Sequence, residues 1–243
     1  INEIINGFVW PKSQRWAYSE LRWARPLRNI LLLLNNQLVE GKVAIDKNNS
    51  LNFSNYTFGH RHDDKKIEVK NIDDYESLLE KNKVIIDRDK RRNKIVSDTK
   101  LLLKDKSIKL LDDNHLLDEI LGLIEFPNVL IGSIDEQFMN LPKEVLTTAM
   151  KVHQKYFSII DNKNNLVPKF LFVSNTIPEK ERDKRVIEGN ERVLKARLSD
   201  ADFFWKTDTS TKIENFNDKL KKVLFYEKFL KTVVMNKSNN NSR

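Results

Sequence analysis

Residues 157–205 carry the clearest structural pattern in the 243-residue chain and read FSIIDNKNNLVPKFLFVSNTIPEKERDKRVIEGNERVLKARLSDADFFW. Two apolar runs, 157–160 and 166–173, flank the polar residues 161–165, which predicts a β-hairpin. A long helix is predicted from about Asp183 to Trp205. Its apolar stripe has members at spacings of 7, 4, 3 and 4 residues, namely Ile187, Leu194, Leu198, Ala201 and Trp205.

The segments before this stretch predict extended structure first. Val9–Lys12 is expected to be extended, because the residue before a proline avoids the helical region. The apolar runs 28–34 and 37–45 are joined by Asn35 and Asn36, which tolerate the positive φ of a tight turn. These two runs therefore predict a second hairpin.

Helical patterns follow from about residue 73. Asp73 or Asp74 is expected to cap a helix through Leu79, whereas 98–104 is only weakly helical. The remaining expectations are a helix after Asp112 or Asp113 that Pro127 stops, a short buried strand at 129–134, a helix from Leu141 to His153, and a last helix at 216–230.

Strands and helices are interspersed here without regular strand–helix alternation. The sequence therefore favours an α+β fold of mixed short strands and hairpins packed with several helices, over a doubly wound parallel sheet. Residues 1–230 are interpreted as one central region, and 231–243 as a polar, frayed tail rich in Asn and Ser. The start at Ile1 and this tail indicate a piece of a longer protein.

Composition limits the functional classes. The formal net charge is +8, which favours polyanionic partners but also suits a lysine-rich surface that only maintains solubility. Without cysteine, the chain cannot form disulfides or cysteine-ligated metal sites. The longest dense apolar run, 30–34, is far shorter than a membrane span, and no signal peptide is visible. We therefore expect no membrane association and a cytoplasmic location.

The predicted long helix carries seven cations within 18 residues. Arg185, Arg192 and Lys195 share the face opposite the apolar stripe, where they could follow a phosphate backbone. The alternative is a solvated face with ion pairs to neighbouring acids. Gly189 and Asn190 interrupt the helix pattern and indicate close packing or a functional break.

A second candidate segment lies where the 141–153 helix ends. His153, Gln154, Lys155, Tyr156 and Phe157 combine an imidazole, an amide, an ammonium group and two aromatics. Such a mixture suits RNA ends or loops, where unpaired bases stack on aromatic rings. The alternative is structural, because basic residues complement a helix C-terminus and the aromatics could be core.

A third candidate is the loop with His60, Arg61, His62 and Asp63, which resembles a metal site. A metal-dependent phosphohydrolase around His60, His62 and Asp63 is thus an alternative function, although an exposed loop is favoured. Phosphate-binding loops, GxGxxG and GxSxG motifs are absent from the sequence. We predict no catalytic residue and no bound metal.

Nine motifs, taken in order, are similar to the beta subunit of bacterial glycyl-tRNA synthetase. They are Pro11-Lys12-Ser13-Gln14-Arg15-Trp16, Trp23-Ala24-Arg25-Pro26, Gly59-His60-Arg61, Leu116-Leu117-Asp118-Glu119, Glu125-Phe126-Pro127, Leu141-Pro142-x-Glu144-Val145-Leu146, Met150-x-x-His153-Gln154-Lys155-Tyr156-Phe157, Gly189-Asn190-Glu191-Arg192-Val193 and Ala196-Arg197-Leu198-x-Asp200-Ala201-x-Phe203-Phe204. The resemblance covers about 9–230. The chain departs from the family pattern at Ala17, where glycine is usual, and at His62, where an aromatic residue is usual.

The resemblance implies a function in translation. In this family the alpha subunit holds glycine, ATP with Mg²⁺ and the adenylate chemistry. The beta subunit recognises tRNA and completes a heterotetramer of two alpha and two beta subunits. The portion present here resembles the tRNA-binding module of synthetase beta subunits. We therefore expect a non-catalytic fragment of a glycine–tRNA ligase, with no cofactor of its own.

The residues expected to contact tRNA(Gly) on this interpretation are Arg25, His60, Arg61, His153, Gln154, Lys155, Tyr156, Arg185, Arg192 and Lys195. The sequence leaves open a structural module that only holds the partner subunit, because Gly, Pro and aromatic motifs often mark packing.

Overall fold

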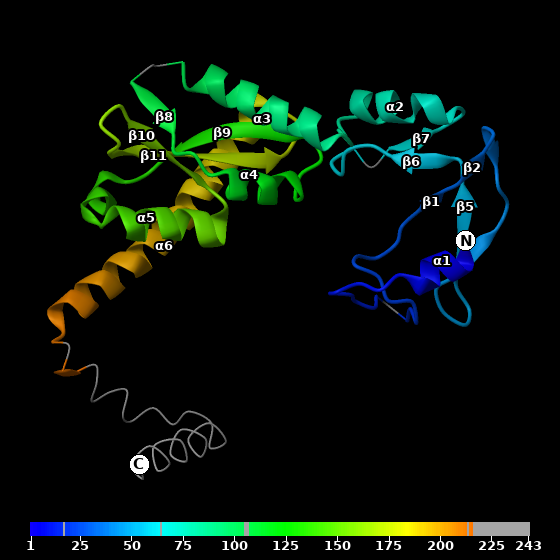
Figure 1. The fold of residues 1–243 in the computed structure, drawn as a ribbon, viewed down its shortest axis with the longest axis horizontal. Coiled ribbons are helices and arrows are strands. Elements are labelled where there is room, and N and C mark those ends of the chain that lie inside the picture. The colour runs from blue at the N-terminus through cyan, green and yellow to red at the C-terminus, as the bar shows by residue number, and fades with distance from the viewer. Residues whose placement is uncertain (17, 64, 105–106, 213, 216–243) are drawn as a thin grey trace, which may run out of the picture.

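The computed structural model describes residues 1–16, 18–63, 65–104, 107–212 and 214–215. Figure 1 shows an N-terminal part, residues 1–82, built from short strands with helices α1 and α2, beside a larger C-terminal part, residues 87–215. The α+β class predicted from the sequence is confirmed. The helix predicted at 216–230, the boundary at 230 and the polar tail all lie outside the described residues.

An antiparallel four-stranded sheet organises the C-terminal part. Its strands are β8 (Ile108–Leu110), β10 (Phe157–Asp161), β11 (Leu166–Asn175) and β9 (Pro127–Ser133), in the order β8-β10-β11-β9. The predicted 157–173 hairpin is confirmed as the β10–β11 pair, and β11 also pairs with β9 over 127–133.

The polar turn of this hairpin is stabilised by one carboxylate. Asp161 Oδ1 accepts hydrogen bonds from the backbone amides of Lys163 and Asn165, each at 2.8 Å. The bond from Asn165 is the largest cause holding the pKa of Asp161 below its ordinary value. Asn164 adopts a φ of 63°, which asparagine tolerates. These contacts explain why 161–165 turns rather than extends a strand.

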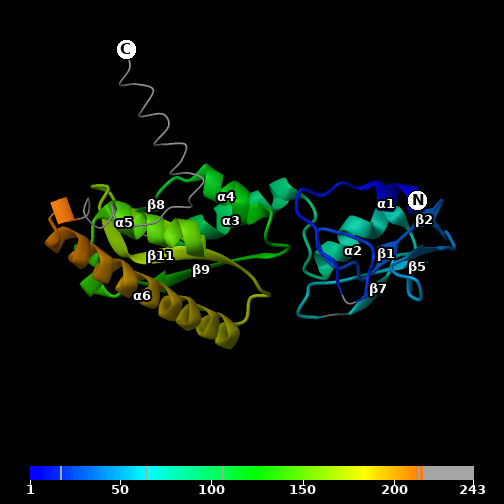
Figure 2. The same cartoon turned by 90° about the horizontal axis from the view of Figure 1, so that it is seen from below.

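Helices cover both faces of the sheet, and β11 is therefore buried on both faces (Figure 2). Phe170 and Phe172 pack into one core cluster, with Leu194 and Leu198 of α6 (Lys180–Ser210). Leu171, on the opposite face, packs into a second cluster with residues of α3 (Arg88–Leu102) and α4 (Asn114–Leu121). The two-residue period of a strand thus separates two cores.

Helix α6 confirms the predicted long helix, but its apolar stripe is buried along only part of its length. Leu194 and Leu198 are buried, whereas Trp205 is 41% exposed. The predicted stripe is therefore buried at Leu194 and Leu198 but not at Trp205. The helix continues past the sheet, as Figure 1 shows, so its last turns have no sheet beneath them.

Helix α3 was missed by the prediction, which gave weak helix only to 98–104. Its 15 residues include six Lys or Arg, and its buried residues are Ile95 and Thr99. So few apolar positions leave almost no amphipathic signal in the sequence. Asp87 caps its N-terminus by accepting a hydrogen bond from the amide of Lys90 at 2.9 Å.

Two helix-cap predictions had different outcomes. Asp113 caps α4 by accepting from the amide of Leu116 at 2.9 Å, as expected. Asp73 and Asp74 make no side-chain cap. Instead, Asn71 accepts from the amide of Asp73 and starts a short 3-10 turn, Ile72–Asp74, that leads into α2 (Tyr75–Lys81). The cap lies earlier because an Asx turn precedes the helix.

The helix predicted from Leu141 to His153 is observed in two pieces. A 3-10 turn, Glu136–Asn140, precedes α5 (Lys143–Thr148), which begins directly after Pro142. The last turn, Ala149–His153, widens into a π-helix. Such π-turns often occur at functional sites.

The N-terminal part contains α1 (Asn2–Gly7) and seven short strands. These are β1 (Ile30–Leu31), β2 (Leu33–Leu34), β3 (Gln37–Leu38), β4 (Lys42–Ala44), β5 (Ser50–Ser54), β6 (Tyr56–Phe58) and β7 (Lys66–Glu68). The predicted hairpin is confirmed as the short β2–β3 pair, with φ of 49° at Asn35 and 62° at Asn36. The flanking β1 and β4 both pair with β5 instead of with each other.

The packing of α6 on the sheet requires a glycine in β9. A Cβ on Gly132 would lie 2.5 Å from Phe170 Cζ and 3.2 Å from Glu191 Cγ. In contrast, a Cβ on Gly189 of α6 would meet nothing within 4 Å. Close packing is therefore not the reason for Gly189, contrary to that sequence-based interpretation.

These two glycines give a matched stability test. Gly132→Ala should lower the free energy of unfolding by about 1–3 kcal/mol, because Phe170 must move out of a packed core. Gly189→Ala should raise it by about 1 kcal/mol, as alanine favours a helix. Urea unfolding of the purified chain measures both. Equal stability of Gly132→Ala and the wild type would contradict the packing described here.

Candidate nucleic-acid interface

A cleft of about 370 Å³ lies at the end of β11, where the N-terminal and C-terminal parts meet. Its polar lining includes Arg61, Gln154, Lys155, Tyr156, Asn175 and Asn190. These residues come from the 59–63 loop, the turn after the π-helix, the end of β11 and α6. The structure thus brings together three segments that the sequence singled out separately.

Tyr156 forms the inner wall of the cleft and is 4% exposed. Its ring stacks on Phe170 at 4.6 Å between centroids, and its hydroxyl donates to Asn190 Oδ1 at 2.6 Å. Burial raises the pKa of Tyr156 to about 12. Asn190 in turn donates to the carbonyl of Val186 at 2.7 Å. In this structure Tyr156 and Asn190 join the sheet to α6, because the Tyr156 hydroxyl and the Asn190 carboxamide oxygen form a hydrogen bond with each other.

The neighbouring residues of the same segment are more open. Gln154 and Lys155 are half-buried in the cleft lining, and Lys155 turns the chain with a φ of 59°. Lys155 Nζ lies 2.8 Å from Glu119 Oε1 of α4. His153 is exposed and lines a separate groove with Arg197 and Phe204. The five-residue segment is therefore divided between two surfaces.

The loop with His60 is part of the fold. His60 is 0% exposed, and its Nε2 lies 3.3 Å from Asn175 Oδ1. The imidazole of His62 stacks on that of His60 at 5.1 Å. No group of three His, Asp or Glu side chains suited to a metal occurs among the described residues. The phosphohydrolase alternative therefore gains no ligand set from them.

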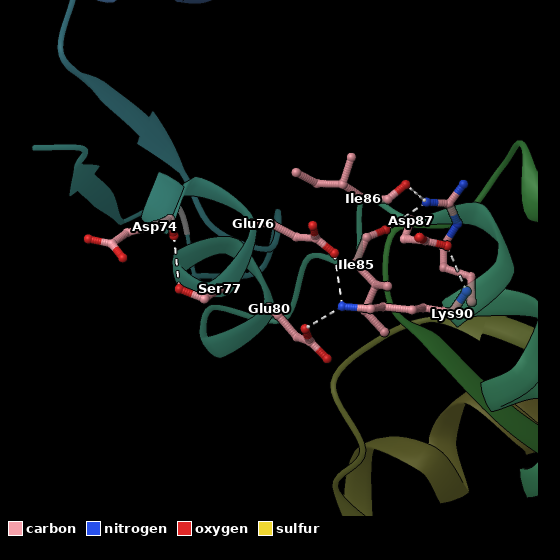
Figure 3. Close-up of polar contacts among 9 residues, drawn as sticks. Asp74, Glu76, Ser77, Glu80, Ile85, Ile86, Asp87 and Lys90 are labelled. Carbon is pink, nitrogen blue, oxygen red and sulfur yellow. Dashed lines mark hydrogen bonds and ion pairs between the residues drawn. The ribbon is translucent and has the colours of Figure 1, made fainter. Parts of the chain in front are cut away.

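Among the described residues, some basic side chains form ion pairs with acidic side chains, and others do not. On α3, Arg88 and Arg92 both contact Asp118. Lys90 Nζ lies 2.9 Å from Glu76 and 3.5 Å from Glu80 of α2, as Figure 3 shows. These glutamates raise the pKa of Lys90, through the Glu76 hydrogen bond first. Arg88, Lys90 and Arg92 of α3 therefore connect elements of the fold.

Helix α6 differs, because two of its three candidate cations are unpaired. Arg185 and Arg192 are exposed, and neither has an ion-pair partner within the part of the chain that the structure describes. Lys195 contacts Asp135 at 2.7 Å. Arg25 is exposed in the N-terminal part and does not line the cleft. Among the three candidate cations of α6, Arg185 and Arg192 therefore carry the charge that no acidic side chain of the described residues pairs with.

Sequence reasoning missed Asn175, Asn128 and Asp183. Asn128 Nδ2 donates to Thr176 Oγ1 at 3.1 Å and to Asp183 Oδ1 at 2.8 Å, which fixes the start of α6 against β9. No motif identifies these residues, because each acts through a partner distant in sequence. The position of Asn175 at the end of β11, after an apolar run, is the one signal available, and it applies to neither Asn128 nor Asp183.

The cleft can hold a ligand about the size of a nucleotide. Donor groups at its lining, Arg61 and the side-chain amide of Gln154, suit a phosphate or the acceptor edges of a base. The described helices include none that is both long and apolar enough to cross a membrane.

Comparison with known proteins first shows the class of protein to which the chain is related. Its relatives are subunits of an aminoacyl-tRNA ligase. The particular family follows from the family model for the glycyl-tRNA synthetase beta subunit, which matches residues 1–237. The chain belongs to this family, and the resemblance seen in its motifs is confirmed.

Three relatives, each named glycine–tRNA ligase beta subunit, give the scale of the match. That of Rhodospirillum centenum is 38% identical over 94% of this chain and 35% of the relative. Those of Rickettsia felis and Rickettsia canadensis are 41% and 42% identical over 94% of this chain, and 34% and 33% of the relatives. The chain thus spans about a third of the length of these relatives.

The electrostatics of the cleft rim can be tested at His62. Partial desolvation is the largest cause that lowers the pKa of His62, and the positive charges of Arg61 and Arg182 lower it further. NMR titration of the imidazole should find this pKa below the ordinary value, and Arg61→Ala should raise it. Arg88→Ala, on α3, is the control and should leave it unchanged.

The lowered pKa of His62 also determines the direction in which the stability of the folded chain changes with pH. The folded chain binds the His62 proton less tightly than the unfolded chain. Stability should therefore fall slightly as the pH drops through the ordinary histidine range. A His62 pKa at or above the ordinary value would contradict this description of the rim.

Proposed function

We propose that this chain contributes to tRNA recognition within the beta subunit of a glycine–tRNA ligase. The whole enzyme would join glycine to tRNA(Gly) at the expense of ATP in the cytoplasm. The observation that supports the proposal best is the cleft, which combines Arg61 and the Gln154–Tyr156 segment at one site. Unpaired bases or ends of RNA are recognised by such combinations of donors and aromatic surfaces.

The outer face of α6 would supply the electrostatic part of binding. Arg185 and Arg192 are exposed without a partner among the described residues, so both charges are free to meet phosphates. Lys195 could contribute if it exchanged Asp135 for phosphate. Because His60 and Tyr156 are buried, we propose that they shape the cleft and that Arg61, Gln154 and Lys155 make the contacts. Arg25 and His153 would contact RNA outside the cleft.

The chemistry of aminoacylation would lie elsewhere in the assembled enzyme. We propose that this chain binds no cofactor, and that the alpha subunit holds ATP, Mg²⁺ and glycine. Two alpha and two beta subunits would form the active heterotetramer. On this proposal the chain itself makes no catalytic contribution beyond binding and assembly.

The basic face gives a direct test by tRNA titration. Arg185→Ala combined with Arg192→Ala should weaken binding and lower the slope of log K against log salt by about 1.5, because two phosphate contacts are lost. Affinity for tRNA(Gly) and for a non-cognate tRNA should fall alike, since phosphate contacts carry no sequence information.

The matched control removes the same charge at the far end of β11. Lys163 lies in the β10–β11 turn and Lys169 in the first half of β11, and both are exposed. Lys163→Ala combined with Lys169→Ala should leave the salt slope unchanged. Equal effects of the two double variants would mean that α6 contributes only non-specific positive charge to tRNA binding.

A second candidate function, contact with the partner subunit, is favoured by one surface. Phe203, Phe204 and Trp205 of α6 are 64%, 61% and 41% exposed. Phe204 also lines the groove of about 560 Å³ between α5 and α6, with Val145 and Ala149. Adjacent exposed aromatics of this kind mark protein interaction sites.

Subunit contact can be separated from tRNA binding by substitution. Phe203→Ser combined with Phe204→Ser should weaken association with the alpha subunit by about tenfold or more, as loss of a central aromatic contact does. Sedimentation of the purified chain with the alpha subunit measures this, and tRNA affinity should not change. Leu101→Ser is the control, because Leu101 of α3 is 60% exposed outside this surface and outside the cleft. Unchanged association would argue against the surface.

A further inference from the structure

Asn175 makes an unusual set of hydrogen bonds at the end of β11. Its Oδ1 accepts from the backbone amides of Glu125 and Phe126, each at 3.0 Å, and lies 3.3 Å from His60 Nε2. Backbone amides can only donate, so the atom facing all three partners must be the carboxamide oxygen. One oxygen therefore joins the loop before β9 to a side chain of the N-terminal part.

This arrangement also assigns the tautomer of His60. Because Asn175 Oδ1 is an acceptor, Nε2 of His60 must carry the hydrogen. Its Nδ1 is then free to accept from the amide of His62, which lies 3.4 Å away. Both ring nitrogens of a side chain that is 0% exposed are satisfied in this way.

The opposite side of the 59–62 loop is held just as closely. The amide of His60 donates to the carbonyl of Asn82 at 2.9 Å. A Cβ on Gly59 would lie 3.0 Å from Asn82 Cβ and 3.2 Å from its carbonyl oxygen, so a side chain at 59 would have to push Asn82 back. Asn82 and Asn175 therefore hold the loop from both sides, and Arg61 lies between the two histidines that they fix.

A separate ionic contact joins the two parts away from the cleft. Lys90 of α3 contacts Glu76 and Glu80 of α2, and Asp87 caps α3 beside them (Figure 3). These side chains are about half-exposed, so water screens the attraction. None of them lines the cleft. The Lys90 contact can therefore be removed as a control that loosens the same junction without touching the His60 loop.

We propose that Asn175 is a positioning residue for RNA recognition, which holds His60 and thereby places Arg61 at the cleft. The proposal rests on the proposed function, because Arg61 is the group that would meet the RNA. Asn175 acts through His60 and makes no required contact with RNA itself. Removing its oxygen should cost as much RNA affinity as removing the Arg61 side chain.

A double-mutant cycle on tRNA affinity tests this coupling. Arg61→Ala and Asn175→Ala should each weaken binding by about tenfold, the scale of one charge-assisted contact. The combined variant should be no weaker than either single variant. Asn175→Asp, which keeps an oxygen acceptor for the three donors, should restore the slow hydrogen exchange at 59–63 that Asn175→Ala loses. Lys90→Ala should leave the effect of Arg61→Ala unchanged.

Two further measurements keep the test decisive. Nitrogen-15 NMR of the imidazoles should show the Nε2–H tautomer of His60 in the wild type and in Lys90→Ala, but not in Asn175→Ala. Hydrogen exchange at 59–63 should accelerate in Asn175→Ala. Asn175→Gln, which displaces the oxygen by one methylene, replaces Asn175→Ala in every arm if that variant does not fold.

The outcomes separate this proposal from the proposed function. Additive losses in the cycle, no rescue by Asn175→Asp, or an unchanged His60 tautomer would each overturn the role of Asn175. If the wild-type chain bound no tRNA, the proposed function would fail. The NMR and exchange results would then decide by themselves whether Asn175 holds the loop.

Discussion

The pairing of β11 with β9 is the constraint on which the rest of the structure depends. Residues 169–175 pair with 127–133 in continuous register, and both faces of β11 are covered. Once this register is set, Phe170 must cross Gly132, and α6 can approach only because that position lacks a side chain. The same register brings Asn175 to the strand end beside Glu125 and Phe126. Core packing and the geometry of the cleft therefore have one origin.

The family motifs serve packing and contact together, and burial separates the two roles. In Gly59-His60-Arg61, the glycine admits Asn82, the histidine is buried against Asn175, and the arginine alone is exposed. In the 153–157 segment, Tyr156 and Phe157 are core residues, whereas His153 is exposed. A motif that binds RNA needs a rigid support, because a mobile arginine loses entropy on every contact it makes.

Charge alone does not identify a nucleic-acid surface in this chain. Helices α3 and α6 are both rich in Lys and Arg, and their sequences give no reason to prefer either. In the fold, acidic side chains of α2 and α4 meet Arg88, Lys90 and Arg92 of α3, so these cations contribute to joining elements. Arg185 and Arg192 are exposed and meet no such partner among the described residues. A phosphate would therefore displace fewer existing contacts on α6 than on α3.

The sequence by itself determined the α+β class, the β10–β11 hairpin, the long helix and the family, because each rests on local periodicity or on ordered motifs. It also selected most of the segments that line the cleft. It did not reveal α3, whose apolar pattern is too weak, nor the burial of His60. Only the tertiary structure decided which cations are free, and which polar residues hold the site together. Asn175, for example, acquires its partners from positions 50 and 115 residues away, and hydrogen bonds across such separations leave no local pattern in a single sequence.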